Sequence, residues 1–320
     1  MNEKTGFVAT GVVTLRVVDT STDVTGTRTN STGVAVLISV AAGVLLAILW
    51  SFEFVDSVIG DNVANTLLGR AAKTTPIDGS VAGLLFAFVS GFAGTFTACN
   101  IAMAASIGPM SAAGAGERTG LLRALLRPLG AFAAGMVTVS AVYGFVGVLL
   151  GERLPQLSTD VVGSMPVRLL QSSVVFGLVG LAMVYLGLAS LGVVRDVFAG
   201  RPTARVVALG ALVGAFLIGR PYPMFVKLFH WAADTGNPLY GAATFALQSL
   251  GNILLVSVLF ALLVLGSRGR FLRWLAGNPR RTAVITGTLL LGLGVFTVVY
   301  WDLRVPSLFG FGWFPAMPYN

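Results

Sequence analysis

Seven long apolar segments dominate the chain, and polar connections separate them. The segments cover 33–51, 79–115, 128–151, 169–193, 206–233, 240–266 and 283–302. In lipid a backbone must satisfy its own hydrogen bonds, and these segments lack the period-two alternation of membrane β-strands. We therefore predict that every segment is helical and that the chain is an all-α polytopic membrane protein.

Two of the segments are too long to be single straight helices. Residues 79–115 carry no charge and would extend about 55 Å as one helix, whereas the hydrocarbon core of a bilayer is about 30 Å thick. Residues 206–233 show a smaller excess and contain Pro221 and Pro223, which remove backbone donors. We predict that both segments break, bend or re-enter.

The predicted breaks fall in corresponding places. The segments from 79 to 193 form one group of three and those from 206 to 302 form another, and each group opens with an over-long, glycine-containing segment. Because three is odd, the second group crosses the membrane in the opposite sense. This pattern predicts a six-helix core of two inverted three-helix repeats with broken first helices, plus one extra N-terminal transmembrane helix, and a site near the midplane. Alternatively, glycines such as Gly210 and Gly214 only permit close helix packing.

Composition and charge agree with a membrane protein. Of the 320 residues, 55% are hydrophobic and 11% are charged, and the mean hydropathy is +0.86, which excludes a soluble domain. The formal net charge of +8 would suggest nucleic acid in a soluble protein, but the Lys and Arg residues are divided unequally along the chain. The N-terminal tail and alternate connections hold fourteen, and the other set, with Arg220 and Lys227 of the segment 206–233 counted, holds seven. Basic connections gather on the cytoplasmic side, so we predict no nucleic-acid partner. The predicted location is the plasma membrane, with a cytoplasmic N-terminus and an extracytoplasmic C-terminus.

The predicted organisation has four parts. A polar tail over 1–32 is expected to be disordered, and the extra transmembrane helix covers 33–51. The core covers 79–302, and an aromatic extracytoplasmic tail covers 303–320.

The first candidate site surrounds the single cysteine. Cys99 follows Thr97 and precedes Asn100 in an otherwise apolar stretch. A thiol there is a candidate redox group, or an inert buried side chain. One cysteine and one histidine exclude an internal disulfide and the usual multi-ligand zinc site, so we predict no metal and no cofactor.

The second candidate site is the run Arg220-Pro221-Tyr222-Pro223. Arg220 lies fourteen residues after Val206, about 21 Å along a helix and therefore deep in the membrane. An intramembrane arginine usually faces a cavity or a partner, and a proline-broken helix exposes carbonyls that line a pathway. The alternative is an interfacial arginine that snorkels from a shorter span.

Lys227 and His230 follow three residues apart, on one helix face, beside Trp231. They are candidates for attracting an anion, or they lie at the outer membrane interface. Met103, Met110 and Met224 lie near the two breaks, where they either form a soft-metal path with Cys99 or simply pack. No hydrolytic nucleophile–base–acid set is visible, and the span interiors lack the carboxylates of a proton relay.

Residues 79–302, about 70% of the chain, resemble the transmembrane region of the cytochrome c biogenesis and thiol-disulfide carrier proteins, the CcdA/DsbD membrane family. The resemblance rests on the two broken segments, each followed by two ordinary spans. It also rests on the phrases PLGAFAAG at 128–135 and ALQSLGNI at 246–253.

In that family each break carries Pro-Cys followed by a further proline, and the two cysteines pass reducing equivalents from a thioredoxin to an extracytoplasmic thiol protein. The first break here keeps Cys99 but has Ala98 and Ala102 at the proline positions. The second break keeps Pro221 but has Tyr222 at the cysteine position. The resemblance implies the fold and a partner, a thioredoxin-like or haem-handling protein, bound by mixed disulfide at Cys99.

Three functions are open at this point. The first is a diverged or accessory role in thiol redox or cytochrome c maturation. The second is transport of a small solute or metal ion on the same inverted repeat, with Cys99, Asn100, Arg220 and Tyr222 at its centre. The third is a non-catalytic membrane scaffold.

Overall fold

A computed structural model describes residues 23–51, 53–94, 121–268, 270, 273–274, 277–315 and 317. Its helices are α1 (Asp23–Leu49), α2 (Asp61–Leu68), α3 (Ser80–Ala93), α6 (Leu121–Leu150), α7 (Val167–Ser190), α8 (Pro202–Ala215), α9 (Pro223–Asp234), α10 (Pro238–Gly266), α12 (Pro279–Val298) and α13 (Val305–Ser307). Two π-helical segments, η1 (Glu53–Gly60) and η4 (Val299–Arg304), and the 3₁₀ turn η3 (Gly151–Arg153) supplement them. The short strands β1 (Val161–Val162) and β2 (Met165–Pro166) form an antiparallel hairpin.

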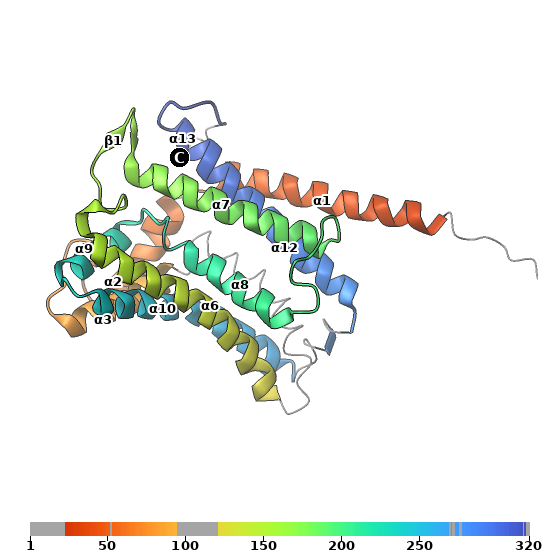
Figure 1. Cartoon of the computed structure of the whole chain (residues 1–320), viewed down its shortest axis with the longest axis horizontal. Helices are drawn as coiled ribbons and strands as arrows, with labels where there is room; N and C mark the ends of the chain where they lie inside the picture. Colours follow the sequence, from red (N-terminus) through yellow and green to blue (C-terminus); the bar gives the residue numbers. More distant parts are fainter. Residues whose placement is uncertain are drawn as a thin grey trace, which may run out of the picture.

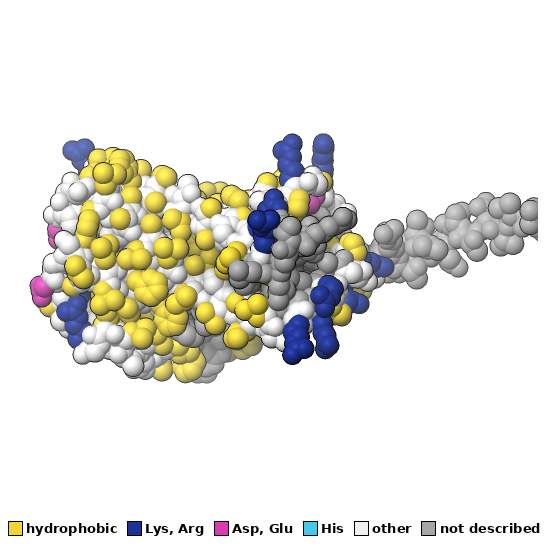
Figure 2. Space-filling view, turned by 90° about the horizontal axis from the view of Figure 1, so that it is seen from below, with side chains coloured by type: hydrophobic (Ala, Val, Ile, Leu, Met, Phe, Trp, Pro, Cys, Tyr) yellow, Lys and Arg dark blue, Asp and Glu magenta, His cyan; other side chains and the backbone are white. Residues whose placement is uncertain are grey.

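The described part of the chain is an all-α membrane protein. By length and composition, four of its helices are able to cross a membrane: Ser31–Leu49, Leu126–Arg153, Val167–Ser190 and Pro279–Ser307. Two shorter apolar helices are α3 and α8. Figure 2 shows an apolar surface with few charges between the two ends of the molecule, and more Lys and Arg side chains at the end where α1 begins.

The helices form two groups that lie side by side. In one group α3 packs on α10, α10 on α6, and α6 on α8; in the other, α7 packs on α12 and α12 on α1 (Figure 1). A shared apolar core, which includes Phe132, Phe176 and Phe296, joins α6, α7 and α12. The break between α8 and α9 therefore lies within closely packed helices.

Glycines bring α3 and α10 into backbone contact. A Cβ atom added to Gly91 of α3 would overlap the carbonyl oxygen of Gln248, and one added to Gly251 of α10 would overlap that of Phe88. Only a residue without a side chain allows helices to approach this closely.

The contact between α6 and α8 has the same form. A Cβ atom on Gly210 of α8 would overlap the carbonyl oxygen of Phe132, and one on Gly135 of α6 would overlap that of Val207. The helices α7 and α12 also meet through glycine, because a Cβ atom on Gly294 would lie 2.7 Å from the carbonyl oxygen of Gly180.

The two over-long segments are described to different extents. The second is interrupted, because α8 ends at Ala215 and α9 begins at Pro223. In the first, α3 ends at Ala93, and residues 95–120, where the predicted break falls, lie outside the described residues.

The helices at both ends of the described chain extend beyond the apolar segments 33–51 and 283–302. Helix α1 begins at Asp23, inside the tail expected to be disordered over 1–32, since no proline interrupts the chain there. At the other end, η4 and α13 continue the last span to Ser307, into the tail predicted over 303–320. Asp302 lies in η4 with its Oδ2 atom buried, so the prediction of carboxylate-free span interiors is wrong at this end.

The close glycine contact of α8 with α6 leads to a prediction. We expect Gly210→Ala to lower the thermal unfolding midpoint of the purified protein, because the added methyl group forces the helices apart at a cost of about 1–3 kcal/mol. Gly130→Ala in α6 is the matched control, because nothing lies within 4 Å of the new Cβ atom and alanine favours the helix. Equal midpoints for the two variants would contradict the packing described.

Candidate functional site

The break in the second over-long segment, residues 216–222, brings polar groups into the interior. Pro223 begins α9, and its ring and that of Pro221 prevent a continuous helix from α8. Arg220 is 4% exposed and Tyr222 is 2% exposed. Arg220 therefore does not snorkel to the surface, because the fold encloses its side chain.

The break leaves backbone carbonyl groups without helical hydrogen-bond partners, and polar side chains from other elements donate hydrogen bonds to them. The Gln171 amide of α7 donates to the carbonyl oxygen of Ile218 at 2.9 Å. The Gln156 amide donates to the carbonyl oxygen of Arg220 at 2.7 Å, and the Tyr143 hydroxyl donates to Gln156 Oε1. The sequence predicted that freed carbonyls line a pathway, but these two carbonyls are bound by side chains.

The Arg220 guanidinium connects the second break to the end of α3. Its Nη2 donates to the carbonyl oxygen of Gly94 at 2.8 Å, and its Cζ lies 4.6 Å from the centre of the Phe225 ring. A Cβ atom on Gly94 would lie 2.7 Å from Arg220 Nη1, so a side chain there would displace the guanidinium from its present position. The contact joins residues that are 126 positions apart in the sequence.

Tyr222 connects the break to the segment that precedes α3. Its hydroxyl donates to Asp61 Oδ1 at 2.7 Å, and Asp61 forms an ion pair with Lys73. Lys73 Nζ also lies 5.8 Å from the centre of the Tyr222 ring. Sequence reasoning missed Asp61 and Lys73, since charged residues in a connection usually face solvent and no local pattern marks their partner.

Lys227 and His230 lie on α9 in different environments. Lys227 Nζ donates to the carbonyl oxygens of Ala72 at 2.7 Å and of Thr75, and lies 5.3 Å from the centre of the Phe86 ring. His230 is exposed. Lys227 therefore fixes α9 to the connection before α3, and His230 stays accessible.

An open pocket of about 430 Å³ lies beside the second break. Its lining consists of Arg168, Pro221, Pro223, Val226, Lys227 and His230. Four of these residues belong to the candidate sites identified from the sequence, and Arg168 is added by the fold. Arg168 comes from the first turn of α7, and no sequence signal links it to α9.

The structure does not describe the first candidate site. Cys99, Thr97 and Asn100 lie outside the described residues, as do Met103 and Met110. Met224 is completely buried in an apolar cluster with Phe225 and Leu228. Among the described residues no group of three His, Cys, Asp or Glu side chains is arranged to hold a metal ion.

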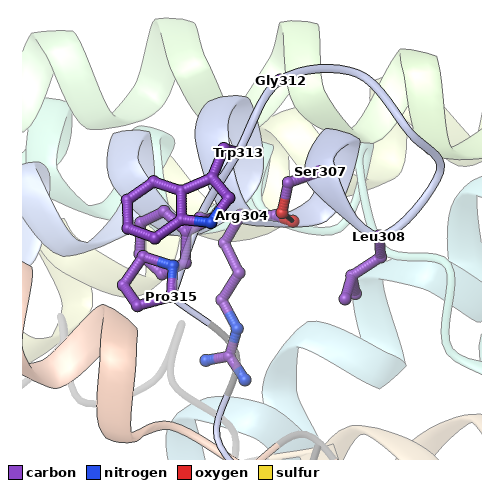
Figure 3. A pocket seen from close by; sticks show the side chains of 7 residues that line it. Arg304, Ser307, Leu308, Gly312, Trp313 and Pro315 are labelled. Carbon is purple, nitrogen blue, oxygen red and sulfur yellow. Dashed lines mark hydrogen bonds between the residues drawn. The ribbon is translucent and has the colours of Figure 1, made fainter.

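A smaller pocket of about 140 Å³ lies near the C-terminus, and Figure 3 shows Arg304 between Trp313 on one side and Leu308 on the other. The Arg304 guanidinium donates to the carbonyl oxygens of Ala47 and, at 2.7 Å, of Trp50. These carbonyls lie at and just beyond the end of α1. Arg304 thus caps α1 and fixes it to the core.

The Tyr222 hydroxyl gives a second prediction. Because it is buried against Asp61, we expect Tyr222→Phe to lower the thermal unfolding midpoint through loss of one hydrogen bond, worth about 0.5–1.5 kcal/mol. Asp61→Ala should lower the midpoint further, because it also removes the ion pair with Lys73. The double variant should lower the unfolding midpoint by less than the sum of the two single decreases, with all midpoints measured in the same detergent. Strictly additive losses would mean that the two side chains do not interact.

Comparisons of the chain with protein-family models, with curated proteins and with solved structures find no match. The resemblance to the CcdA/DsbD membrane family stays a prediction.

Proposed function

We propose that the chain is a diverged or accessory member of the membrane family that handles thiol redox and cytochrome c maturation, and that its working site lies where two helix breaks meet. The contact of Arg220 with the Gly94 carbonyl carries this proposal. Gly94 precedes Cys99 by five residues, and five residues span at most about 18 Å. The second break is therefore tied to the segment that leads to the single thiol.

The glycine contacts support a core of two inverted halves. Each of the four helices α3, α10, α6 and α8 contains a residue whose carbonyl oxygen contacts a glycine of the neighbouring helix. Three positions after that residue, each helix has a glycine that contacts a carbonyl oxygen of the same neighbour. The four pairs are Phe88 and Gly91, Gln248 and Gly251, Phe132 and Gly135, and Val207 and Gly210. The first helix of each half thus packs on the second helix of the other half, α3 on α10 and α8 on α6. The spacing of the contact residues is the same in both pairs. A pseudo-twofold relation between the halves accounts for this match.

The proposed location is the plasma membrane, with a cytoplasmic N-terminus and an extracytoplasmic C-terminus. The connections that join α7 to α8 and α10 to α12 carry exposed arginines, among them Arg195, Arg268 and Arg280. Basic residues near span ends favour the cytoplasmic side. The hairpin β1–β2 and the pocket beside α9 would then face the extracytoplasmic side.

A single thiol restricts the proposed chemistry to exchange with partners. The Cys99 thiolate would attack a partner disulfide, form a mixed disulfide with one partner sulfur and release the other as a thiolate. A thiolate of a second, reduced partner of the thioredoxin-like class would then attack the Cys99 sulfur, release the first partner as a dithiol and form a new mixed disulfide with Cys99. The other thiolate of that second partner would displace Cys99 as a thiolate and leave the second partner oxidised to a disulfide. Each transfer moves two electrons without an internal disulfide.

A mixed-disulfide trap tests the redox proposal. We expect the full-length protein in membrane vesicles to form a reductant-sensitive adduct with a thioredoxin-like protein that lacks its second cysteine and carries its remaining cysteine as a mixed disulfide with thionitrobenzoate, which the Cys99 thiolate displaces. A Cys99→Ser, Ser267→Cys variant is the matched control, because it places one thiol in a connection, and we expect its adduct to form at least about tenfold more slowly. The proposal fails if wild type forms no adduct, or forms it no faster than the control.

The second candidate function is transport of a small solute, and the open pocket beside the second break favours it. Transporters of the inverted-repeat kind place their sites at discontinuous helices. In this case Arg220 and Tyr222 would line the path between the halves.

Uptake into proteoliposomes separates the two candidates. If the protein transports a solute, Cys99→Ser should leave the uptake rate unchanged and Arg220→Ala should lower it at least about tenfold, because the break loses its buried cation. Size-exclusion profiles of both variants control for misfolding. Uptake that falls with Cys99→Ser and persists with Arg220→Ala would exclude the transport mechanism.

A further inference from the structure

The pocket beside the second break lies at the N-terminal parts of two helices, α7 and α9. Arg168 belongs to the first turn of α7, and Pro223, Val226 and Lys227 belong to the first two turns of α9. A helix carries partial positive charge at its N-terminus, so both helices favour an anion in this pocket.

The titratable side chains of the lining are all bases. They are Arg168, Lys227 and His230, and no Asp or Glu is among the six residues that line the pocket. Arg168 and His230 are exposed. The Arg168 guanidinium forms no ion pair with another described residue.

The three bases play different parts. Lys227 directs its ammonium group at the carbonyl oxygens of Ala72, Lys73 and Thr75, so it contributes charge and few free donors. Arg168 offers the planar donor fork that matches two oxygens of a phosphate or carboxylate. His230 offers a ring N–H group. Basic side chains from two helices therefore line one open volume.

We propose that this pocket binds an anionic oxygen group, a phosphate or a carboxylate, at the outer end of the second break. A volume of about 430 Å³ accommodates a small organic anion or a lipid headgroup. The proposal goes beyond the thiol function, because it requires no electron transfer and no cysteine. If the chain is a transporter, the pocket also identifies the solute as an anion.

Binding of inorganic phosphate to the full-length protein tests a soluble source, and retention of phosphatidylglycerol during purification tests a lipid source. Titration calorimetry in a phosphate-free, uncharged detergent measures the first, and native mass spectrometry measures the second. The variant Arg168→Gln, His230→Gln removes the free donors. Arg153→Gln is the matched control, because Arg153 is exposed in η3, in the connection before α7, and does not line the pocket.

We expect the double variant to weaken phosphate binding, or phosphatidylglycerol retention, at least about tenfold, since each charge-assisted hydrogen bond is worth about a factor of ten. Arg153→Gln should stay within about twofold of wild type. Loss of phosphate binding alone identifies a soluble anion, and loss of lipid retention alone identifies a headgroup. The proposal is overturned if wild type shows neither, or if both variants match wild type. Because neither readout involves Cys99, failure here is distinct from failure of the thiol trap.

Discussion

A backbone inside a membrane must form its hydrogen bonds within the protein, and the break between α8 and α9 has to meet this requirement. Pro221 and Pro223 prevent a continuous helix, and side chains from distant elements form the hydrogen bonds that the interrupted backbone lacks. Gln171 and Gln156 bind the carbonyl oxygens of Ile218 and Arg220. Arg220 in turn binds the Gly94 carbonyl at the end of α3. The positions of α3, α7 and the connection after α6 therefore all depend on how one interrupted helix satisfies its backbone.

The close approach of the helices around the break has a second cause. Glycines in α3, α6, α8 and α10 bring backbones together, because a side chain at Gly91 or Gly210 would overlap a neighbouring carbonyl oxygen. These contacts pack the group of α3, α10, α6 and α8 closely next to a segment that is not helical. The segment is also fixed from outside by the Tyr222–Asp61 hydrogen bond and by Lys227. A closely packed frame around an interrupted helix suits a site that has to present a few groups in fixed positions.

The sequence predicted the all-α membrane class and the interruption of 206–233, because hydropathy and proline act locally and leave a clear pattern. It also selected Arg220 and Tyr222, since polar residues inside an apolar run stand out. It did not identify Gln156, Asp61 or Arg168, which lie in connections or at a helix start and meet the break only through the fold. Hydropathy marks only the apolar part of α1, and the helix itself begins at Asp23, among polar residues. The redox role of Cys99 remains a prediction, because this residue lies outside the described residues.

The central claim is that Arg220 joins the second break to the end of α3, and a distance between these two residues tests it most directly. Solid-state NMR on lipid-embedded protein, with ¹⁵N in arginine side chains and ¹³C in glycine carbonyls, measures the dipolar coupling between them. The hydrogen bond of 2.8 Å and a carbonyl bond of about 1.2 Å predict a nitrogen–carbon separation of at most about 4 Å. The account predicts a strong cross-peak that Arg220→Lys removes, and a spectrum in which that variant removes no cross-peak would contradict it.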